Sequence, residues 1–169
     1  MSDSAMTVPH TRRQLDEVQV AQREIQQLKD TIIGDGVNLA SRLEGLCKEY
    51  KTRILISETT YKALRGTYRS REVDRVIVKG KTNPVGIYEI LDYHDDTSFP
   101  NIQEVLNLFK SGLGEYRRQN WERAIRHFSG ALRLNPDDPL SDIYVQRCQR
   151  LQAEPPLEEW DGVWIMKTK

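Results

Sequence analysis

The segment Thr31-Ile-Ile-Gly-Asp-Gly-Val-Asn-Leu-Ala-Ser-Arg-Leu-Glu44 predicts the end of a strand, a tight turn and the start of a helix. Gly34 and Gly36 permit a sharp bend or a positive φ on either side of the central aspartate. After the turn, apolar residues recur at helical spacing, at Val37, Ala40 and Leu43. The segment therefore joins a strand to an amphipathic helix, and the rest of the prediction extends outward from this junction.

Two polar residues lie on one face of that predicted helix. Asn38 and Arg42 are four residues apart, so they project in the same direction from its first turns. An amide and a guanidinium at a helix N-terminus suit a polar, anionic ligand, because the helix adds partial positive charge there. The alternative is structural: Asn38 only starts the helix, and Arg42 pairs with Glu44 or Glu49 on the surface.

Composition sets limits on the whole chain. Its 169 residues hold 25 acidic and 25 basic side chains, so no overall field favours nucleic acid or an anionic membrane as a partner. No apolar run reaches the length of a membrane span, and the N-terminus lacks the pattern of a signal peptide, so we expect a cytoplasmic protein. Cys47 and Cys148 are predicted to be free thiols. The three histidines have no metal-binding spacing.

The N-terminal segment, residues 1–30, is predicted to be disordered and then helical. Residues 1–10 lack any folding pattern. Residues 11–29 are polar and free of Gly and Pro, with a thin apolar stripe of about two heptads, which is short for a coiled coil. This helix either lies solvated on the domain or forms a dimer, and both alternatives stay open.

Residues 31–93 predict an α+β domain with a small, mostly antiparallel sheet. A β-rich run at 53–57 reads as a buried strand, and Ser57 then caps a helix to about Arg65. Residues 68–78 and 85–91 flank a Gly- and Pro-containing turn and predict a hairpin.

The remaining residues predict helices and a docked tail. Residues 94–101 are polar and are expected to form a linker. Residues 102–154 are predicted to form a helical hairpin plus a covering helix, and the hairpin resembles a tetratricopeptide repeat. Small and aromatic residues at the repeat's spacings carry this resemblance: Gly112, Tyr116, Trp121, Ala124, Phe128, Ala131 and Pro136. The tail, residues 155–169, contains two tryptophans and is expected to dock on the helices or the sheet.

The string GDGVNLASRLE, followed by ILISETTY and VDRVIVKGKTNPVGIYEIL, resembles the class III nucleotide cyclases over about Thr31–Leu91. The resemblance implies a partial ferredoxin-like cyclase domain that acts on ATP. It also implies that Asn38 orients the ribose and that Arg42 stabilises charge on the α-phosphate. Thr31 would read the purine edge as adenine, and Lys79, ranked above Lys81, would meet the terminal phosphates.

The resemblance also implies an active site between two catalytic domains, formed by a homodimer or with a second cyclase domain. Family members use Mg²⁺ or Mn²⁺ held by two aspartates in the first half of the domain. No pattern like that half is found in residues 1–30, so the metal ligands are expected to be absent, and Asp35 is assigned to the turn instead. The same gap would leave apolar strand residues without partners: Ile32, Ile54, Ile56 and Ile77.

Three hypotheses for function follow. In the first, the chain is part of an adenylate cyclase and is inactive alone, because the metal-binding half is missing. In the second, it is a half-site partner that lends its nucleotide-binding residues to a complete cyclase. In the third, it is a non-enzymatic protein that binds a protein partner through the helical repeat.

Overall fold

The computed structural model describes residues 36–77, 83–156 and 160–165. The chain divides into two compact units, Met1–Ala40 and Ser41–Lys169, and almost all described residues belong to the second. A helix over residues 36–50 comes first. It is followed in order by β1 (Leu55–Ser57), α2 (Glu58–Ala63), β2 (Ser70–Ile77), β3 (Val85–Ile90), α3 (Ile102–Arg117), α4 (Trp121–Leu134), α5 (Pro139–Ala153) and β4 (Trp164–Ile165).

The sheet has the strand order β1-β3-β2-β4. β3 lies in the middle of an antiparallel group, pairing with β1 on one side and β2 on the other, and β4 adds a short parallel pairing to β2. The hairpin of β2 and β3 forms where the sequence predicted it. The predicted α+β class with a small, mostly antiparallel sheet is confirmed.

A bulge in β2 changes which of its side chains face the interior. Between Glu72 and Asp74 the strand advances two residues while its partner β3 advances one, from Tyr88 to Ile87. An extra residue in one strand shifts the alternation of side chains by one position. Arg71 before the bulge and Asp74 after it are therefore both buried, which strict alternation does not allow.

Local capping explains two of the helix starts. The Ser57 hydroxyl accepts a hydrogen bond from the Thr60 N–H at 3.2 Å, as the sequence predicted for α2. At α5, Asp138 accepts from the Ser141 N–H at 3.3 Å, and Pro139 occupies the first turn. Both starts are fixed by side chains that are themselves buried.

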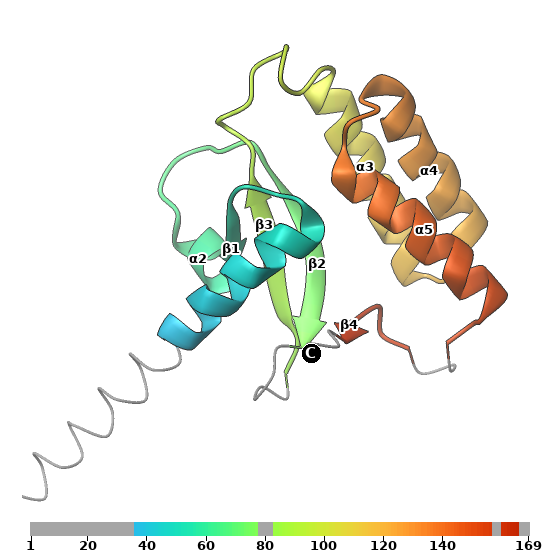
Figure 1. Cartoon of the computed structure of the whole chain (residues 1–169), viewed down its shortest axis with the longest axis horizontal. Coiled ribbons are helices and arrows are strands. Elements are labelled where there is room, and N and C mark those ends of the chain that lie inside the picture. Colours follow the sequence, from blue (N-terminus) through green and yellow to red (C-terminus); the bar gives the residue numbers. More distant parts are fainter. Residues whose placement is uncertain (1–35, 78–82, 157–159, 166–169) are drawn as a thin grey trace, which may run out of the picture. The chain divides into compact units, whose positions relative to one another are not determined.

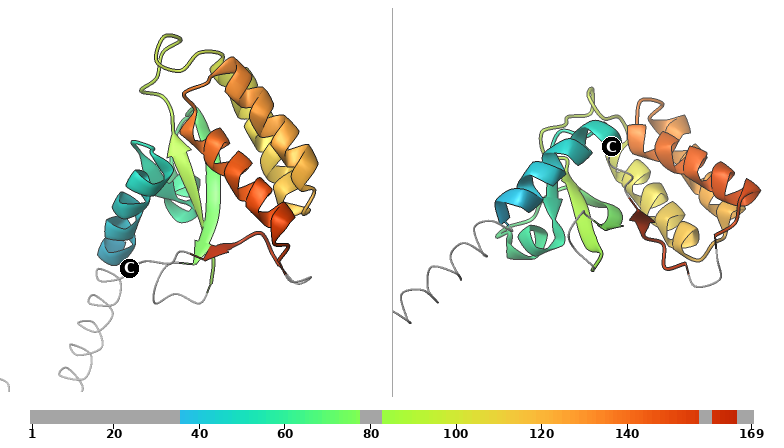
Figure 2. Two further views of the ribbon diagram at one scale, coloured as in Figure 1. Left: turned by 45° about the vertical axis from the view of Figure 1, so that its right-hand side comes forward. Right: turned by 60° about the horizontal axis from the view of Figure 1, so that its bottom comes forward.

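The three C-terminal helices pack together as one helical layer, in which α4 contacts both α3 and α5 and α3 contacts β2 (Figure 1 and Figure 2). α3 and α4 approach closely at Gly112, where a Cβ would lie only 2.7 Å from the Phe128 ring. The Phe128 ring in turn meets Phe109 and Tyr144, with centroids 5.3 and 5.1 Å away. A glycine and packed aromatic rings therefore form the centre of this layer.

The segment between β3 and α3, predicted as a linker, contributes to the core. Asp95 accepts hydrogen bonds from the N–H groups of Thr97 and Ser98, at 3.1 and 2.8 Å. The turn that results directs Phe99 inward, where it is 4% exposed. There it packs in one cluster with residues of β3's end and the helices, namely Leu91, Val105 and Ala131.

The described part of the tail contacts both helices and sheet. The Trp160 ring lies 5.2 Å from the rings of Tyr116 and of Trp121. Farther on, β4 pairs with β2 at Val76 and Ile77. Residues 160–165 therefore connect α3 and α4 to the end of the hairpin.

Apolar residues near the sheet differ in exposure. Ile54 is 42% exposed, as expected for an apolar residue without a partner. Ile56 in β1 and Ile77 at the end of β2 are half-buried instead. Ile32 lies outside the described residues.

Candidate functional site

The helix over residues 36–50 carries the two site residues that the structure describes. Its buried stripe consists of Leu43, Leu46 and Tyr50, at the i, i+3 and i+7 positions of one face. Asn38 is exposed and Arg42 is half-buried. The sequence placed both residues on a helix, and the structure does so too.

The alternative reading, in which Arg42 pairs with Glu44 or Glu49, is not borne out among the described residues. Glu44 pairs instead with Lys48, at 3.6 Å between Nζ and Oε1. Within the described part of the chain, no carboxylate makes an ion pair with Arg42. Its guanidinium is therefore not neutralised by Glu44 or Glu49.

The other sequence-predicted positions cannot be placed. Thr31 and Lys79, together with the lower-ranked Lys81 and the turn residue Asp35, lie outside the described residues. Of the predicted nucleotide-binding set, the structure therefore describes only Asn38 and Arg42, on successive turns of one helix.

The C-terminal end of the same helix is held by buried polar groups that the sequence did not reveal. Tyr50 donates a hydrogen bond from its hydroxyl to Asp74 Oδ2, at 2.5 Å. Arg147 of α5 donates from Nη1 to the same oxygen at 2.5 Å, and from Nη2 to the Tyr50 hydroxyl at 3.2 Å. Burial, and then the charge of Asp74, raise the pKa of Tyr50 far above its ordinary value, so the phenol stays protonated and donates.

A second buried cluster joins the sheet to the start of α5. Arg71 donates from Nε to Glu89 at 2.8 Å and from both terminal nitrogens to Asp138, at 3.0 and 2.7 Å. Its guanidinium carbon also lies 4.9 Å from the centre of the Phe109 ring. This cluster connects β2, β3 and α5, and none of its members belongs to the helix over residues 36–50.

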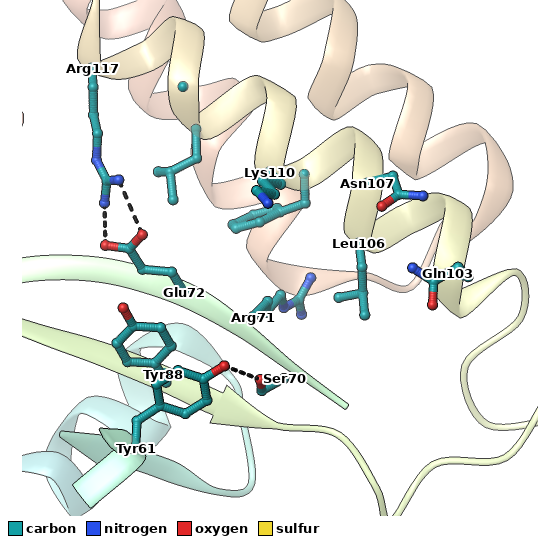
Figure 3. A pocket seen from close by; sticks show the side chains of 13 residues that line it. Tyr61, Ser70, Arg71, Glu72, Tyr88, Gln103, Leu106, Asn107, Lys110 and Arg117 are labelled. Carbon is teal, nitrogen blue, oxygen red and sulfur yellow. Dashed lines mark hydrogen bonds and ion pairs between the residues drawn. The ribbon is translucent and has the colours of Figure 1, made fainter. Parts of the chain in front are cut away.

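A cavity of about 570 Å³ lies between the sheet and α3 (Figure 3). On the sheet side, Tyr61 and Tyr88 stack with ring centres 4.2 Å apart. Across the cavity, Arg117 donates to both carboxylate oxygens of Glu72, at 3.1 and 2.5 Å. Neither Asn38 nor Arg42 lines it.

Neither a cluster of metal ligands nor a membrane-spanning helix is found among the described residues. Among residues 36–77, 83–156 and 160–165, no group of three or more His, Cys, Asp or Glu side chains is placed to hold a metal ion. In the same part of the chain, no helix combines the length and the apolar character needed to cross a bilayer.

The segment that contains Asn38 and Arg42 matches the model of a known protein family. Residues 20–91 match the model of the adenylate and guanylate cyclase catalytic domain. The match ends at the residue expected from the sequence, but it begins well before Thr31. Residues 20–30, which we expected to lie outside the cyclase-like segment, therefore belong to the matched segment. This part of the chain is therefore similar to that catalytic domain.

Three proteins named as adenylate cyclases are also similar to parts of this chain. The chain is 40% identical over 126 residues to "Adenylate cyclase, terminal-differentiation specific" of Dictyostelium discoideum, a match that covers 72% of this chain and 6% of the relative. It is 42% identical over 67 residues to an adenylate cyclase of Anabaena cylindrica, covering 38% of this chain and 13% of the relative. It is 35% identical over 66 residues to adenylate cyclase 1 of Rhizobium meliloti, covering 39% and 10%. No solved structure matches the chain significantly.

The matches cover a small part of each relative, and one of them runs far along this chain. The chain covers only 6%, 13% and 10% of the length of these three relatives. The match to the Dictyostelium protein is longer than the part of the chain up to residue 91, so it extends into the C-terminal helices. That relative therefore has similarity to the helical layer as well as to the cyclase-like segment.

Proposed function

We propose that this chain is part of an adenylate cyclase and contributes groups that hold ATP. The observation that carries the proposal is Arg42. It lies half-buried within the segment that matches cyclase catalytic domains, on a helix whose other end is anchored, and no described carboxylate neutralises it. A guanidinium in that setting suits an anionic ligand better than a structural ion pair.

The proposed roles follow from the chemistry of cyclisation. The 3′-oxygen of ATP attacks its own α-phosphorus, a new P–O bond forms, and pyrophosphate leaves. Charge grows on the oxygens of the five-coordinate phosphorus, and the planar fork of Arg42 is suited to stabilise it. Asn38 would orient the ribose through its amide. Thr31 would bind the edge of adenine, and Lys79 would bind the terminal phosphates.

We assign the metal-binding part of the site to a second catalytic domain. In this proposal, that domain provides the carboxylates that hold Mg²⁺ or Mn²⁺, and the chain by itself does not turn over ATP. The cytoplasmic location and the dimeric arrangement are parts of the same proposal. The resemblance, in which one domain supplies the two metal-binding aspartates and the other supplies the groups that hold the nucleotide, supports this division of roles.

A mixing experiment tests the proposal. The purified chain is combined with a complete cyclase whose own transition-state arginine has been replaced, and cyclic AMP formation from ATP is followed with Mg²⁺ or Mn²⁺. We expect no product from either protein alone and clear product from the mixture. The variant Arg42→Ala should abolish the gain, whereas Lys48→Ala, on the same helix, should retain it. Turnover by the chain alone would contradict the assignment of the metals, and a silent mixture would contradict the half-site.

A second candidate role concerns the C-terminal helices. The match to the Dictyostelium protein extends into them, so they accompany a cyclase-like segment in a second protein. We propose that residues 102–154 form a single tetratricopeptide-like unit that braces the cyclase-like residues 31–93, with residues 94–101 between them. Capture of a protein partner by residues 102–169 alone would favour the interaction module instead.

A further inference from the structure

We infer that Tyr50, Asp74 and Arg147 are positioning residues that orient the helix carrying Arg42, so that α5 takes part in nucleotide binding. This inference rests on the proposed function for the role of Arg42. The connection between α5 and the helix that carries Arg42 rests on contacts within residues 41–169, which form one unit.

Hydrogen bonds join each of the three side chains to the other two. Asp74 Oδ2 accepts from the Tyr50 hydroxyl and from Arg147 Nη1, at 2.5 Å each, and Arg147 Nη2 donates to the Tyr50 oxygen at 3.2 Å. Each side chain comes from a different element: the helix over residues 36–50, β2 and α5. A substitution of any one of these three residues therefore directly changes the contacts of the other two elements.

The set is buried, which makes each contact costly to lose. Tyr50 is 0%, Asp74 1% and Arg147 7% exposed. Removing one partner of a buried ion pair leaves the other charge uncompensated. Tyr144 lies next to these three residues. Its hydroxyl donates to the Val73 carbonyl at 2.7 Å, and its ring centre lies 5.1 Å from the Arg147 guanidinium carbon. These contacts hold α5 against β2 at the same point.

The contact with Tyr50 acts on Arg42 through the helix between them. Eight residues separate the two, which is about 12 Å of helix at 1.5 Å per residue. Leu43 and Leu46 bury the helix, but apolar contacts are non-directional and tolerate tilt or rotation. Hydrogen bonds are directional, so the bonds at Tyr50 select one orientation. A displacement of about 1 Å at a reacting group is enough to slow a reaction strongly.

The chain contains a matched control for this inference. The cluster of Arg71, Glu89 and Asp138 is also buried and also joins the sheet to α5. It makes no contact with the helix over residues 36–50 through the hydrogen bonds of its three members. Asp138→Asn therefore perturbs the attachment of α5 to the sheet without touching Tyr50.

The experiment compares Tyr50→Phe with Asp138→Asn in the full chain. Tyr50→Phe removes one oxygen, keeps the ring and leaves the ion pair of Asp74 and Arg147 in place. Amide hydrogen exchange of residues 42–50 is measured, together with cyclic AMP formation in the mixture with the arginine-deficient cyclase. Arg147→Lys, which retains charge but not both hydrogen bonds, serves as a second variant.

We expect Tyr50→Phe to speed exchange over residues 42–50 by roughly tenfold or more, since a hydrogen bond to a charged group is lost. In the mixture, kcat should fall more than KM rises, because the contribution of Arg42 is made in the transition state. Asp138→Asn should lower the thermal midpoint and leave both readouts as in the wild type.

Two results would overturn the inference: unchanged exchange over residues 42–50 in Tyr50→Phe, or faster exchange without a loss of kcat. A wild-type mixture that makes no cyclic AMP would instead overturn the proposed function. In that case the exchange data still decide whether the contacts of α5 and Asp74 with Tyr50 hold the helix.

Discussion

At the scale of single residues, Gly112 is the tightest point between α3 and α4. A Cβ at this position would lie 2.7 to 2.9 Å from three atoms of the Phe128 ring, and that ring is fully buried. We expect Gly112→Ala to lower the free energy of unfolding by about 1–3 kcal/mol, the usual cost of overpacking a core. Chemical denaturation measures the change.

The same helix provides the control for this prediction. At Gly114 a Cβ would meet only the end of Arg118, at 3.9 Å. Gly114→Ala should therefore raise stability by about 0.5–1 kcal/mol through helix propensity. Equal effects of the two substitutions would contradict the close approach of α3 and α4 at Gly112.

The two cysteines should differ in reactivity. Burial raises the pKa of the Cys148 thiol to about 12, so very little of it is thiolate at neutral or mildly alkaline pH. Cys47 is half-buried and lies on the helix over residues 36–50. At pH 8 we expect a thiol reagent to modify Cys47 quickly and Cys148 only as the protein unfolds. If the Cys47→Ser variant still shows the fast phase, the burial of Cys148 is wrong.

At the scale of elements, the first turn of α5 has two functions that mutations can separate. Asp138 caps the helix through Ser141 and neutralises Arg71 of β2. Asp138→Asn keeps a capping side chain but removes the charge, whereas Asp138→Ala removes both. We expect the alanine variant to be less stable than the asparagine variant by about 1 kcal/mol, the typical value of an N-cap. Equal thermal midpoints would show that the cap contributes nothing.

Elements with strong local signals could be predicted from the sequence. The helix over residues 36–50 follows from its apolar spacing, α2 from the capping Ser57, and the hairpin from the turn between two β-rich runs. The inward charges of β2 could not be predicted in this way. No pattern in the sequence marks Arg71 and Asp74 as inward-facing, because the bulge that turns Asp74 inward has no glycine or other local mark.

In the candidate site, too, local spacings could be predicted from the sequence, whereas contacts between elements could not. Asn38 and Arg42 could be placed on one helix from the sequence, since their relation is a local spacing. The contacts that hold that helix join residues 24, 73 and 97 positions apart. Such pairs depend on how elements pack, and no periodicity within one element reveals them.

At the scale of the whole molecule, buried charges connect the sheet to the C-terminal helices. Arg71, Asp74 and Glu89 are buried; Arg71 pairs with Asp138, which caps the start of α5, and Asp74 pairs with Arg147 inside α5. Without α5, two of these three residues lose an ion-pair partner, and all three lose part of their cover. We expect a fragment of residues 31–93 to be unfolded by circular dichroism and NMR, while the full chain unfolds in one transition.

The control for the fragment is the full chain carrying Asp74→Asn with Arg147→Met. If the buried charges are the reason that the fragment does not fold, this double variant, which removes both charges together, should be closer in stability to the wild type than Arg147→Met alone. A fragment with dispersed NMR signals would show instead that the sheet folds without the helices.

The pairing of Asp74 with Arg147 also has a consequence during synthesis of the chain. The ribosome releases β2 and β3 long before α5, so Asp74 and Arg71 emerge while Arg147 and Asp138 are still untranslated. Until Arg147 leaves the exit tunnel, the nascent sheet keeps its carboxylate and guanidinium groups in contact with water and cannot close its interior. Premature termination between β3 and α5 would thus yield polypeptides that quality-control proteases recognise, rather than a stable half-product.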